Sequence, residues 1–328
     1  MVPHTLFGTS TPLPLLVILL GPTGSGKTAL SLLLAQRFGG EVLSCDSVAV
    51  YRGMEIGTAK PSAAERSAVP HHLLDLVDPD GTMTAGHWAR AAREAAEAVA
   101  ARGRLPIVSG GTGLYLRALT EGLAPLPPRC PALRARLAAS AASKPPGYLH
   151  RILKRVDAPS AARIHPNDTP KLSRAIEVAM VGPAPISAAG RSPLEGFRLL
   201  RIGLNPPRPS LYQRLNERAA HMFASGLLEE TRTLQRRYGA DTPALQSLGY
   251  REAAAVLAGQ LSEQAAIAAA QQGHRNYSKR QLTWFRREPS VHWFQGFGHD
   301  PEIAAGAIAL VESMQATPPV PGTGDPAS

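Results

Sequence analysis

The first 120 residues alternate between short apolar runs and longer stretches with helical periodicity. An apolar run at 13–20 ends at a glycine-rich loop, and a helical pattern follows at 27–38. Two more short strands are expected at 41–45 and 105–109, separated by an alanine-rich helix at 85–102. Alternation of strands and helices favours a parallel sheet covered by helices, so we predict an α/β fold.

The middle of the chain has a different pattern, bounded by proline. A proline-rich hinge at 125–131 precedes a helical, basic stretch at 131–179, which is interrupted at 143–147 and 157–160. A stretch rich in proline and glycine at 181–193 closes it. These boundaries predict a mainly helical domain inserted into the α/β core.

The chain then returns to the pattern of the core. Residues 199–204 predict a strand that rejoins the first sheet, and helical patterns follow at 209–225, 227–238, 250–257 and 262–287, with a short strand at 291–295. The predicted division is a first part of the core at 13–124, the insertion domain at 125–195, a mainly helical completion of the core at 196–316 and a disordered tail at 317–328.

Composition narrows the class of protein. The 328 residues are 44% hydrophobic, which suits a soluble globular chain. The two cysteines, Cys45 and Cys130, provide neither a disulfide framework nor the spacing of a zinc site, which favours a reducing, cytoplasmic location. The first apolar run is too short to span a bilayer, so we expect no membrane association; nothing implies a protein partner.

The formal charge of +10 is concentrated in the middle third of the chain. Residues 1–100 carry 7 Lys and Arg against 9 Asp and Glu, residues 101–200 carry 15 against 5, and residues 201–328 carry 13 against 11. Such a concentration is the pattern expected for a polyanionic partner, although a solvated arginine-rich surface would give the same count.

The loop after the first strand matches the phosphate-binding pattern G-x-x-x-x-G-K-[ST], which is typical of nucleotide-binding and ATP-binding proteins. Its glycines let backbone N–H groups approach phosphate oxygens, Lys27 adds a positive charge, and Thr28 can ligate Mg²⁺. The alternative is a glycine-rich turn that only caps a helix. The loop consists of Gly21, Pro22, Thr23, Gly24, Ser25, Gly26, Lys27 and Thr28.

Asp46 is the only well-placed acidic residue near this loop. It follows the second strand, whereas the third strand ends at Gly110-Gly111-Thr112-Gly113 without an acid. Because ligands gather at the carboxyl ends of parallel strands, we expect the loop, Asp46 and Thr112 to meet at one site. Asp46 could ligate a metal or accept a proton, or it could simply cap a turn.

Two other groups of polar residues have less specific patterns. His71 and His72 lie near Asp75 and Asp78, but their spacing fits no metal motif and favours a structural role. In the insertion domain, Lys171 and Arg174 are three positions apart on a helix, so they share a face that could bind phosphates or simply be solvated.

Several of these segments together resemble the tRNA dimethylallyltransferase family, over about 270 residues. The matching segments are GPTGSGKT at 21–28, DSVAVYRGMEIGTAKP at 46–61, HHLLD at 71–75, GGTGLYL at 110–116, IHPNDTPKLSRAIEV at 164–178, GLLEE at 226–230, LGYRE at 248–252 and SKRQLTWFR at 278–286. The resemblance implies a core like that of the P-loop NTPases.

The resemblance also implies the reaction. Dimethylallyl diphosphate would be the donor, bound by the phosphate loop with Mg²⁺, and the acceptor would be the exocyclic amine of the adenosine 3′-adjacent to the anticodon of a tRNA. By position, Asp46 matches the family's general base and Thr23 matches the residue that assists the diphosphate leaving group, while Arg214 or Arg218 would reach the diphosphate. The residues matching tRNA contacts are Asp46, Ser47, Val48, Ala49, Thr112, Arg134, Pro170, Lys171, Leu172, Ser173 and Arg174.

The sequence departs from the family's usual residues at a few of these positions. Val48 and Ala49 stand where the family usually has Met-Gln, which removes a potential contact to the target base, and Lys171 replaces a usual arginine. Three alternative functions remain: prenylation of a free adenine nucleotide, a small-molecule kinase, and a nucleotide-switched RNA-binding protein without catalysis. The basic insertion argues against the first, and the absence of an N-K-x-D motif argues against the last.

Overall fold

The computed structural model describes residues 12–124, 126–188 and 190–316. Thr120–Pro193 forms one compact unit, and the described residues up to Leu119 and from Leu194 onward form another. The tail at 317–328 and Pro125 of the predicted hinge lie outside the described residues. None of the described helices is long and apolar enough to cross a membrane.

The larger unit is built on a parallel sheet, as the alternating pattern predicts. Its strand order is β3-β2-β4-β1-β5-β6, so β1 lies between β4 and β5, with Val17 opposite both Ile107 and Leu200. All six residues of β1 are buried, which is typical of a central parallel strand. The strands are β1 (Leu15–Leu20), β2 (Glu41–Cys45), β3 (His71–His72), β4 (Pro106–Gly110), β5 (Arg198–Leu204) and β6 (Val291–Phe294).

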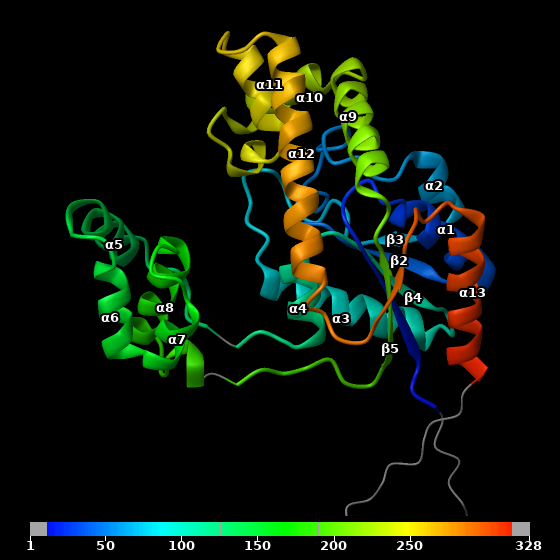
Figure 1. The fold of residues 1–328 in the computed structure, drawn as a ribbon, viewed down its shortest axis with the longest axis horizontal. Coiled ribbons are helices and arrows are strands. Elements are labelled where there is room, and N and C mark those ends of the chain that lie inside the picture. Colours follow the sequence, from blue (N-terminus) through cyan, green and yellow to red (C-terminus); the bar gives the residue numbers. More distant parts are fainter. Residues whose placement is uncertain (1–11, 125, 189, 317–328) are drawn as a thin grey trace, which may run out of the picture. The chain divides into compact units, whose positions relative to one another are not determined.

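Helices cover both faces of the sheet (Figure 1). On one face, Leu19 of β1 packs in a cluster with Leu30 of α1 (Lys27–Phe38) and Val311 of α13 (Pro301–Ala316). On the other face, Ile18 packs in a cluster with Trp88 of α3 (Ala85–Ala101), together with α4 (Gly113–Thr120). Alternate side chains of β1 therefore belong to two separate cores, as the pleat of a strand requires.

A group of helices within the same unit adds a third core. The N-terminal part of α12 (Glu263–Phe285) packs there through Ala266 and Ala270, while Phe285 at its other end packs on the sheet. With 23 residues, α12 is about 35 Å long, so it can join two distant cores. The other members of this group are α9 (Arg208–Ala224), α10 (Leu227–Tyr238), η2 (Pro243–Gln246) and α11 (Tyr250–Leu257).

The smaller unit is all helical and has a core of its own. Leu149 and Leu153 of α6 pack against Leu137, Leu172 and Ile176. Residues Arg151, Lys154 and Arg155 of the same helix are not buried, so its basic and apolar faces are separate. The elements are α5 (Pro131–Ser143), α6 (Tyr148–Val156), α7 (Ala158–Arg163), α8 (Thr169–Val181) and η1 (Ile186–Ala188).

The predicted α/β fold class with a helical insertion is confirmed, and the differences have local causes. The predicted break at 157–160 is present but limited to Asp157, because α6 ends at Val156 and α7 begins at Ala158. The Asp157 carboxylate accepts a hydrogen bond from Ser160 N, and Pro159 lies in the first turn, where no N–H is needed. Strand β3 and the helices α2 (Ala63–Ala68) and α13 are not predicted individually.

Candidate active site

The phosphate loop joins the end of β1 to the start of α1, and its glycines are needed there. Gly24 and Gly26 have φ angles of 80° and 89°, which residues with side chains rarely adopt. A Cβ on Gly24 would lie 2.9 Å from Leu215 Cδ2, and one on Gly26 would lie 2.7 Å from Gly298 N. The loop therefore fits closely between α9 and the segment after β6.

Lys27 folds back over this loop. Its Nζ donates hydrogen bonds to Gly21 O at 2.9 Å and Pro22 O at 2.8 Å. Burial lowers the pKa of Lys27 to about 7, and the neighbouring Arg218 lowers it too, while Asp46 opposes both. An incoming anion would therefore favour the charged ammonium.

Asp46 both caps a turn and faces a cavity. Its Oδ1 accepts hydrogen bonds from Val48 N at 2.8 Å and Ala49 N at 3.1 Å. Among the described residues, none donates a hydrogen bond to Oδ2, which leaves this oxygen available for other chemistry. Ser47 N donates to Thr112 Oγ1 at 3.0 Å, so the ends of β2 and β4 meet as the sequence predicts.

The carboxyl ends of the central strands surround a cavity of about 330 Å³. It contains phosphate-loop residues, Asp46 and Ala49, two arginines of α9 and Gln281 of α12. Thr112 is not among its lining residues and instead holds Ser47. The polar side chains relevant here are Thr23, Lys27, Thr28, Asp46, Lys60, Arg214, Arg218 and Gln281.

The two arginines that the sequence leaves as alternatives differ in their partners. Arg214 lies with Nη1 3.3 Å from the ring nitrogens of His299 and with its guanidinium over the ring of Phe297. Arg218 makes no hydrogen bond or ion pair with the described residues, and its Nε is buried. Burial lowers the pKa of Arg218, and Asp46 opposes this. Arg218 is therefore a cation that a bound anion could pair with.

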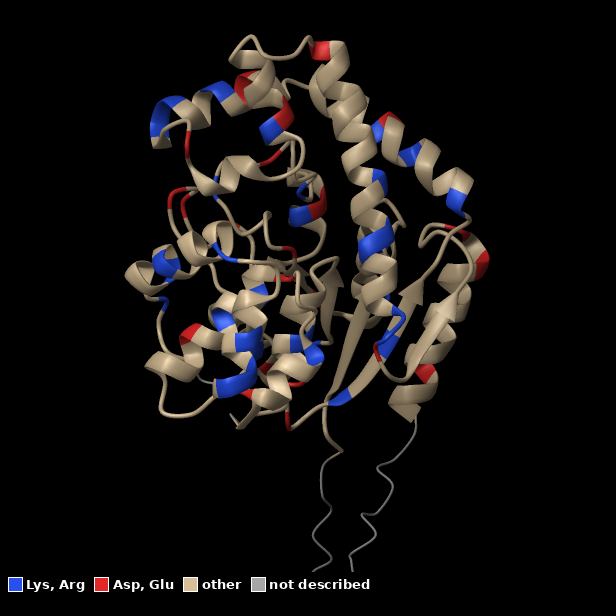
Figure 2. Cartoon of the chain, turned by 60° about the vertical axis from the view of Figure 1, so that its left-hand side comes forward, with Lys and Arg blue, Asp and Glu red and all other residues tan. Residues whose placement is uncertain are grey.

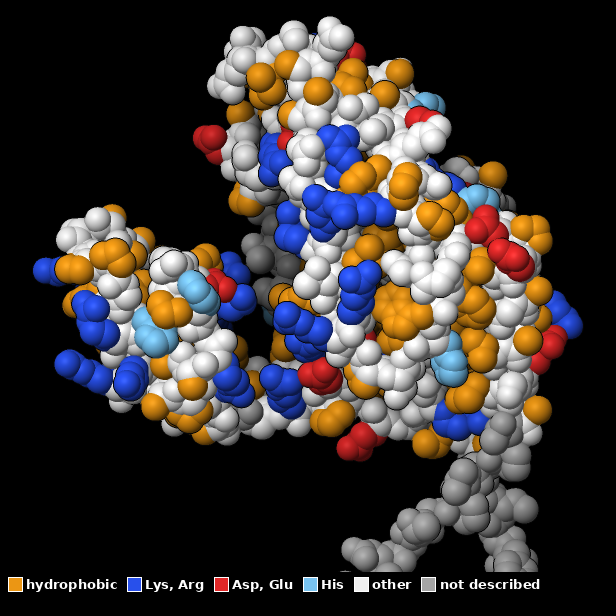
Figure 3. Space-filling view, viewed as in Figure 1, with side chains coloured by type: hydrophobic (Ala, Val, Ile, Leu, Met, Phe, Trp, Pro, Cys, Tyr) orange, Lys and Arg blue, Asp and Glu red, His pale blue; other side chains and the backbone are white. Residues whose placement is uncertain are grey.

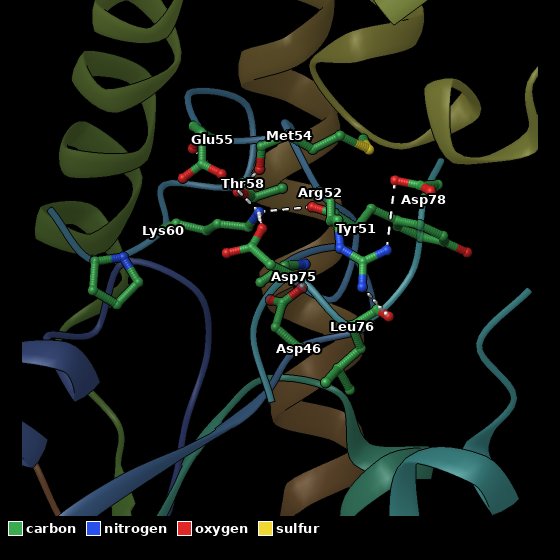
Figure 4. Close-up of polar contacts among 12 residues, drawn as sticks. Asp46, Tyr51, Arg52, Met54, Glu55, Thr58, Lys60, Asp75, Leu76 and Asp78 are labelled. Atoms are coloured by element: carbon green, nitrogen blue, oxygen red, sulfur yellow. Dashed lines mark hydrogen bonds and ion pairs between the residues drawn. The ribbon is translucent and has the colours of Figure 1, made fainter. Parts of the chain in front are cut away.

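The segment after Asp46 is held by ion pairs around one buried lysine (Figure 4). Lys60, whose side chain is fully buried, donates from Nζ to Tyr51 O at 2.7 Å, to Asp75 Oδ1 at 2.5 Å and to Glu55 Oε1 at 2.9 Å. Arg66 of α2 contacts the same two carboxylates. These contacts fix residues 46–61, which we call the Asp46 loop.

The Asp46 loop is also attached to α10 and α11. The carboxylate of Glu230 accepts hydrogen bonds from the backbone N–H groups of Glu55, Ile56 and Gly57, the shortest of them 2.9 Å from Ile56 N. The Tyr250 hydroxyl donates to the same carboxylate at 2.6 Å, and burial raises the pKa of Tyr250, so it stays a donor. Four donors therefore converge on Glu230.

The histidine pair has structural partners. His72 Nε2 lies 2.6 Å from Glu41 Oε2, which Arg102 also contacts. His71 Nδ1 lies 2.8 Å from Val69 O. Within the part of the chain that the structure describes, no group of three or more His, Cys, Asp or Glu residues could hold a metal ion. Thr28, the predicted metal ligand, is exposed beside the cavity.

In the smaller unit, two predicted tRNA contacts share one buried carboxylate. Glu177 is fully buried, and Arg134 Nε contacts it at 3.1 Å while Arg174 Nη1 contacts it at 2.6 Å. Cys130 N donates to it as well, at 2.6 Å. Burial raises the pKa of Glu177, but the hydrogen bonds from Arg174 and Arg134 outweigh this and lower it. Both arginines therefore hold the fold of this unit together.

The other predicted contacts in the smaller unit lie in the first turn of α8. The side chain of Lys171 is 71% exposed and lies 2.5 Å from Asp168, whose carboxylate also caps the helix. Leu172 is buried in the core, while Pro170 is exposed and Ser173 is partly exposed. Of this group, Lys171 has the charge most available to a partner.

The sequence alone assigns no role to several residues at the site. Gln281, Glu230 and Tyr250 occur only as letters within the motifs SKRQLTWFR, GLLEE and LGYRE. The partners of Gln281, and those of Glu230 in the Asp46 loop, lie 170 or more positions away, so no local pattern reveals these contacts. The three residues lie on α10, α11 and α12. Their place within motifs of the family is the sequence signal that could identify them.

Comparison with known proteins identifies the family. A family model described as IPP transferase matches residues 49–288. A tRNA dimethylallyltransferase from Koribacter versatilis is 57% identical over 303 residues, which are 92% of this chain and 99% of that protein. A tRNA dimethylallyltransferase from Solibacter usitatus is 50% identical over 300 residues, 90% of this chain and 97% of that one.

Solved structures agree with the sequence comparisons. The tRNA isopentenylpyrophosphate transferase of Bacillus halodurans has a TM-score of 0.68 and 36% identity, with 92% of this chain and 98% of that chain covered. A eukaryotic dimethylallyltransferase acting on tRNA has a TM-score of 0.77 and 25% identity, with 94% of this chain and 81% of that chain covered. With a phosphate loop, an acidic residue and a matching fold in one chain, this protein belongs to the IPP transferase family of tRNA dimethylallyltransferases.

Proposed function

We propose that this enzyme transfers the dimethylallyl group of dimethylallyl diphosphate to the exocyclic amine of the adenosine 3′-adjacent to the anticodon of a tRNA. The observation that supports this most is the cavity shared by the phosphate loop and Asp46. In the reaction, the bond from the allylic carbon to the diphosphate oxygen breaks and a bond from that carbon to the amine nitrogen forms. One proton leaves the amine, and diphosphate departs.

The donor's diphosphate binds where the cations are concentrated. Lys27 and Arg218 line the same cavity, and Arg218 is left without an anionic partner by the described residues. Backbone N–H groups of the loop and the N-terminus of α1 add partial positive charge. Because negative charge builds up on the leaving group as the allylic bond breaks, these groups stabilise the transition state more than the bound donor. Thr23, also on the cavity wall, assists the departure.

Asp46 is the base in this proposal. Its Oδ1 is held by two backbone N–H groups, which fixes the plane of the carboxylate. Its Oδ2, to which no described residue donates a hydrogen bond, accepts the amine proton or orients the amine. A carboxylate with one oxygen immobilised and one free is suited to proton transfer at a defined position.

Mg²⁺ fits the residues of this cavity. The exposed Thr28 side chain and the Asp46 carboxylate line the cavity beside the loop. One or two protein oxygens together with substrate phosphates and water are the usual ligands of Mg²⁺ in proteins, and larger clusters of carboxylates are not required. Thr28 would hold the ion, which would neutralise part of the diphosphate charge.

The tRNA binds through basic surfaces of both units. In α12, Lys and Arg occur only in the C-terminal half (Figure 2). A groove of about 500 Å³ beside this half is lined by Arg208, Tyr212, Lys279 and Arg286. Figure 3 shows Lys and Arg side chains on the visible face of each unit. Such surfaces bind phosphates through charge and give affinity that falls with salt.

One assay tests the proposed function against its alternatives. Purified protein is incubated with Mg²⁺, allyl-labelled dimethylallyl diphosphate, and either unmodified tRNA or AMP. We expect label in tRNA, at the adenosine next to the anticodon. Label in AMP and not in tRNA would identify an adenylate prenyltransferase, and label in neither, with tRNA still bound, would identify a binding protein. In a parallel incubation with ATP, transfer of its γ-phosphate to a small molecule would identify a kinase.

A further inference from the structure

We propose that Gln281 is a positioning residue for the transfer reaction, and that its side-chain amide sets the position of the phosphate loop at Thr23. This proposal rests on the proposed function, because it assigns Thr23 to the site where diphosphate leaves. Gln281 lies on α12, far along the chain from the loop, and only 5% of it is exposed. Nothing in the reaction itself requires a glutamine at this place.

The Gln281 amide connects the segments that follow two neighbouring strands, acting as an acceptor toward one and as a donor toward the other. Its Oε1 accepts a hydrogen bond from Thr23 N at 2.8 Å, and its Nε2 donates one to Gly111 O at 2.9 Å. Thr23 follows β1 and Gly111 follows β4, and these strands are neighbours in the sheet. Only a side chain with an acceptor and a donor at the same reach can make both contacts, and an amide does so at every pH.

The glycine-rich segment after β4 makes room for this contact. A Cβ on Gly111 would lie 2.1 Å from Gln281 Nε2, and a Cβ on Gly113 would lie 2.3 Å from the ring of Trp284, one turn further along α12. Although a Gly-Gly-Thr-Gly segment resembles a phosphate-binding loop, its glycines here accommodate a helix. The GGTGLYL motif after β4 and the SKRQLTWFR motif on α12 therefore pack against each other.

The contact bears on the reaction through Thr23. The Thr23 N–H is committed to Gln281, so it is directed toward the protein, while Thr23 itself lines the cavity. The backbone that carries the Thr23 hydroxyl is thereby fixed relative to β4. Because misplacing a reacting group by about 1 Å can cost about 100-fold in rate, loosening this contact should reduce turnover more than binding.

The decisive variant is Gln281→Glu, which keeps the size of the side chain and replaces only its NH₂ donor by an oxygen. An ionised carboxylate can still accept from Thr23 N, but it meets Gly111 O without a proton and adds negative charge near the departing diphosphate. When protonated, it can donate to Gly111 O again. Burial favours the protonated form, so the change should occur within an accessible pH range.

We expect Gln281→Glu to lower kcat by about 10-fold to 100-fold at pH 8. The Kd for tRNA should stay close to that of the wild type. The melting temperature should be lower than that of the wild type at pH 8 and recover toward it at pH 6, because a buried carboxyl resists ionisation. The ratio of its kcat to that of the wild type should rise at least threefold as the pH falls from 8 to 6. Dividing by the wild type removes pH effects that the two enzymes share. The other ionisable side chains that line this cavity are Lys27, Asp46, Lys60, Glu65, His71, Arg214 and Arg218.

Two further variants complete the experiment. Gln281→Met fills the same space without either hydrogen bond, so its kcat should fall similarly but its ratio to the wild type should not depend on pH. This variant decides the matter if Gln281→Glu does not fold. Gln272→Glu makes the same chemical change at an exposed position of α12 and should leave kcat within about twofold.

Three results would overturn the proposal: kcat within twofold of the wild type for both Gln281 variants, a kcat ratio for Gln281→Glu that does not change with pH, or weaker tRNA binding at unchanged kcat, which would make Gln281 a tRNA contact. Failure of the proposed function is separate, because the wild type would then transfer no label to tRNA.

Discussion

Asp46 shows how one carboxylate can hold a turn with one oxygen and keep the other for the proton transfer that we propose. The hydrogen bonds from Val48 N and Ala49 N occupy Oδ1, and Oδ2 faces no described donor. The sequence leaves a turn residue, a metal ligand and a base as alternatives, and the structure supports the turn directly. A turn role does not exclude the others, because the turn uses Oδ1 and leaves Oδ2 available.

Replacing Asp46 by asparagine (D46N) tests the base without disturbing the turn. The side-chain amide oxygen of this variant can still accept from Val48 N and Ala49 N, but the second position becomes a donor. We expect kcat to fall by about 100-fold or more, with tRNA affinity and melting temperature nearly unchanged. Single-turnover kinetics and filter binding measure the two effects. Turnover within tenfold of the wild type would exclude Asp46 as the base.

The lowered pKa of Lys27 predicts that the enzyme takes up a proton when it binds the donor. Its pKa is lowered to about 7, first by burial and then by Arg218, so at pH 8 most of the free enzyme carries a neutral Lys27. Bound diphosphate favours the charged form and raises this pKa, so binding at pH 8 should take up close to one proton. At pH 6, where Lys27 is already charged, it should contribute almost none.

Calorimetry in two buffers measures this uptake. Titrating dimethylallyl diphosphate into the enzyme at pH 8 should give apparent enthalpies that differ by the difference in buffer ionisation enthalpy. Equal enthalpies in the two buffers at pH 8 would contradict the assignment. The sign for stability follows the same logic: the unfolded chain binds more protons between about pH 7 and 10, so Lys27 makes the free energy of unfolding rise with pH there.

At the scale of elements, the Asp46 loop depends on helices that are distant in sequence. Residues 55–57 donate to Glu230 of α10, and Tyr250 of α11 completes the set. A Cβ on Gly57 would lie 2.3 Å from the ring of Tyr250, so the loop lies directly on this ring. The helices of the third core thereby set the shape of the loop that begins at Asp46.

Glu230→Gln tests this dependence. A glutamine presents an NH₂ group at a place where four donors converge. At least one hydrogen bond is therefore lost, and the NH₂ group faces another donor. We expect the free energy of unfolding to fall by about 1–3 kcal/mol and kcat with tRNA to fall by about tenfold. Donor affinity, set at the phosphate loop, should change less than twofold.

The neighbouring residue supplies the control. Glu229, in the same turn, pairs with Arg232 on the surface, so Glu229→Gln should change stability by less than about 0.5 kcal/mol. Denaturation and steady-state kinetics on both variants separate the two positions. If both variants behave alike, the Glu230 carboxylate does not hold the loop.

Elements were predictable where the pattern is local. The helices α10 and α11 and the strand β2 have the predicted bounds, because periodicity and glycine mark them clearly. The two-residue strand β3 is too short to show a period, and it exists only because β2 offers a free edge. The contacts of Gln281 and Glu230 depend on how helices are placed in space, which residue spacing does not contain.

At the scale of the whole molecule, charge follows the division into units. The middle third carries the net positive charge, and it largely coincides with the unit Thr120–Pro193. Within it, Arg134 and Arg174 are committed to Glu177, so reversing either charge would place a second negative charge beside a buried carboxylate. Lys171, with its exposed side chain, offers a test that leaves the core intact.

Lys171→Glu should weaken tRNA binding without affecting the donor. Loss of one phosphate contact should lower the slope of log Kd against log salt by about one, and affinity should fall by about tenfold at physiological salt. Filter binding across a salt series measures both quantities. Arg37→Glu, a reversal of equal charge on α1, is the control. An unchanged salt slope would show that this turn of α8 does not meet the RNA.

The segments that lead into and out of the smaller unit lie against each other. A Cβ on Gly122 would be 2.2 Å from Ser192 O, so the chain leaves the core and returns to it at nearly the same point. A short turn could bridge that distance, and no strand of the sheet would be interrupted. We therefore expect the smaller unit to be exchangeable: a shortened enzyme should keep its donor pocket, and a foreign RNA-binding domain grafted there should direct the same chemistry to another nucleic acid.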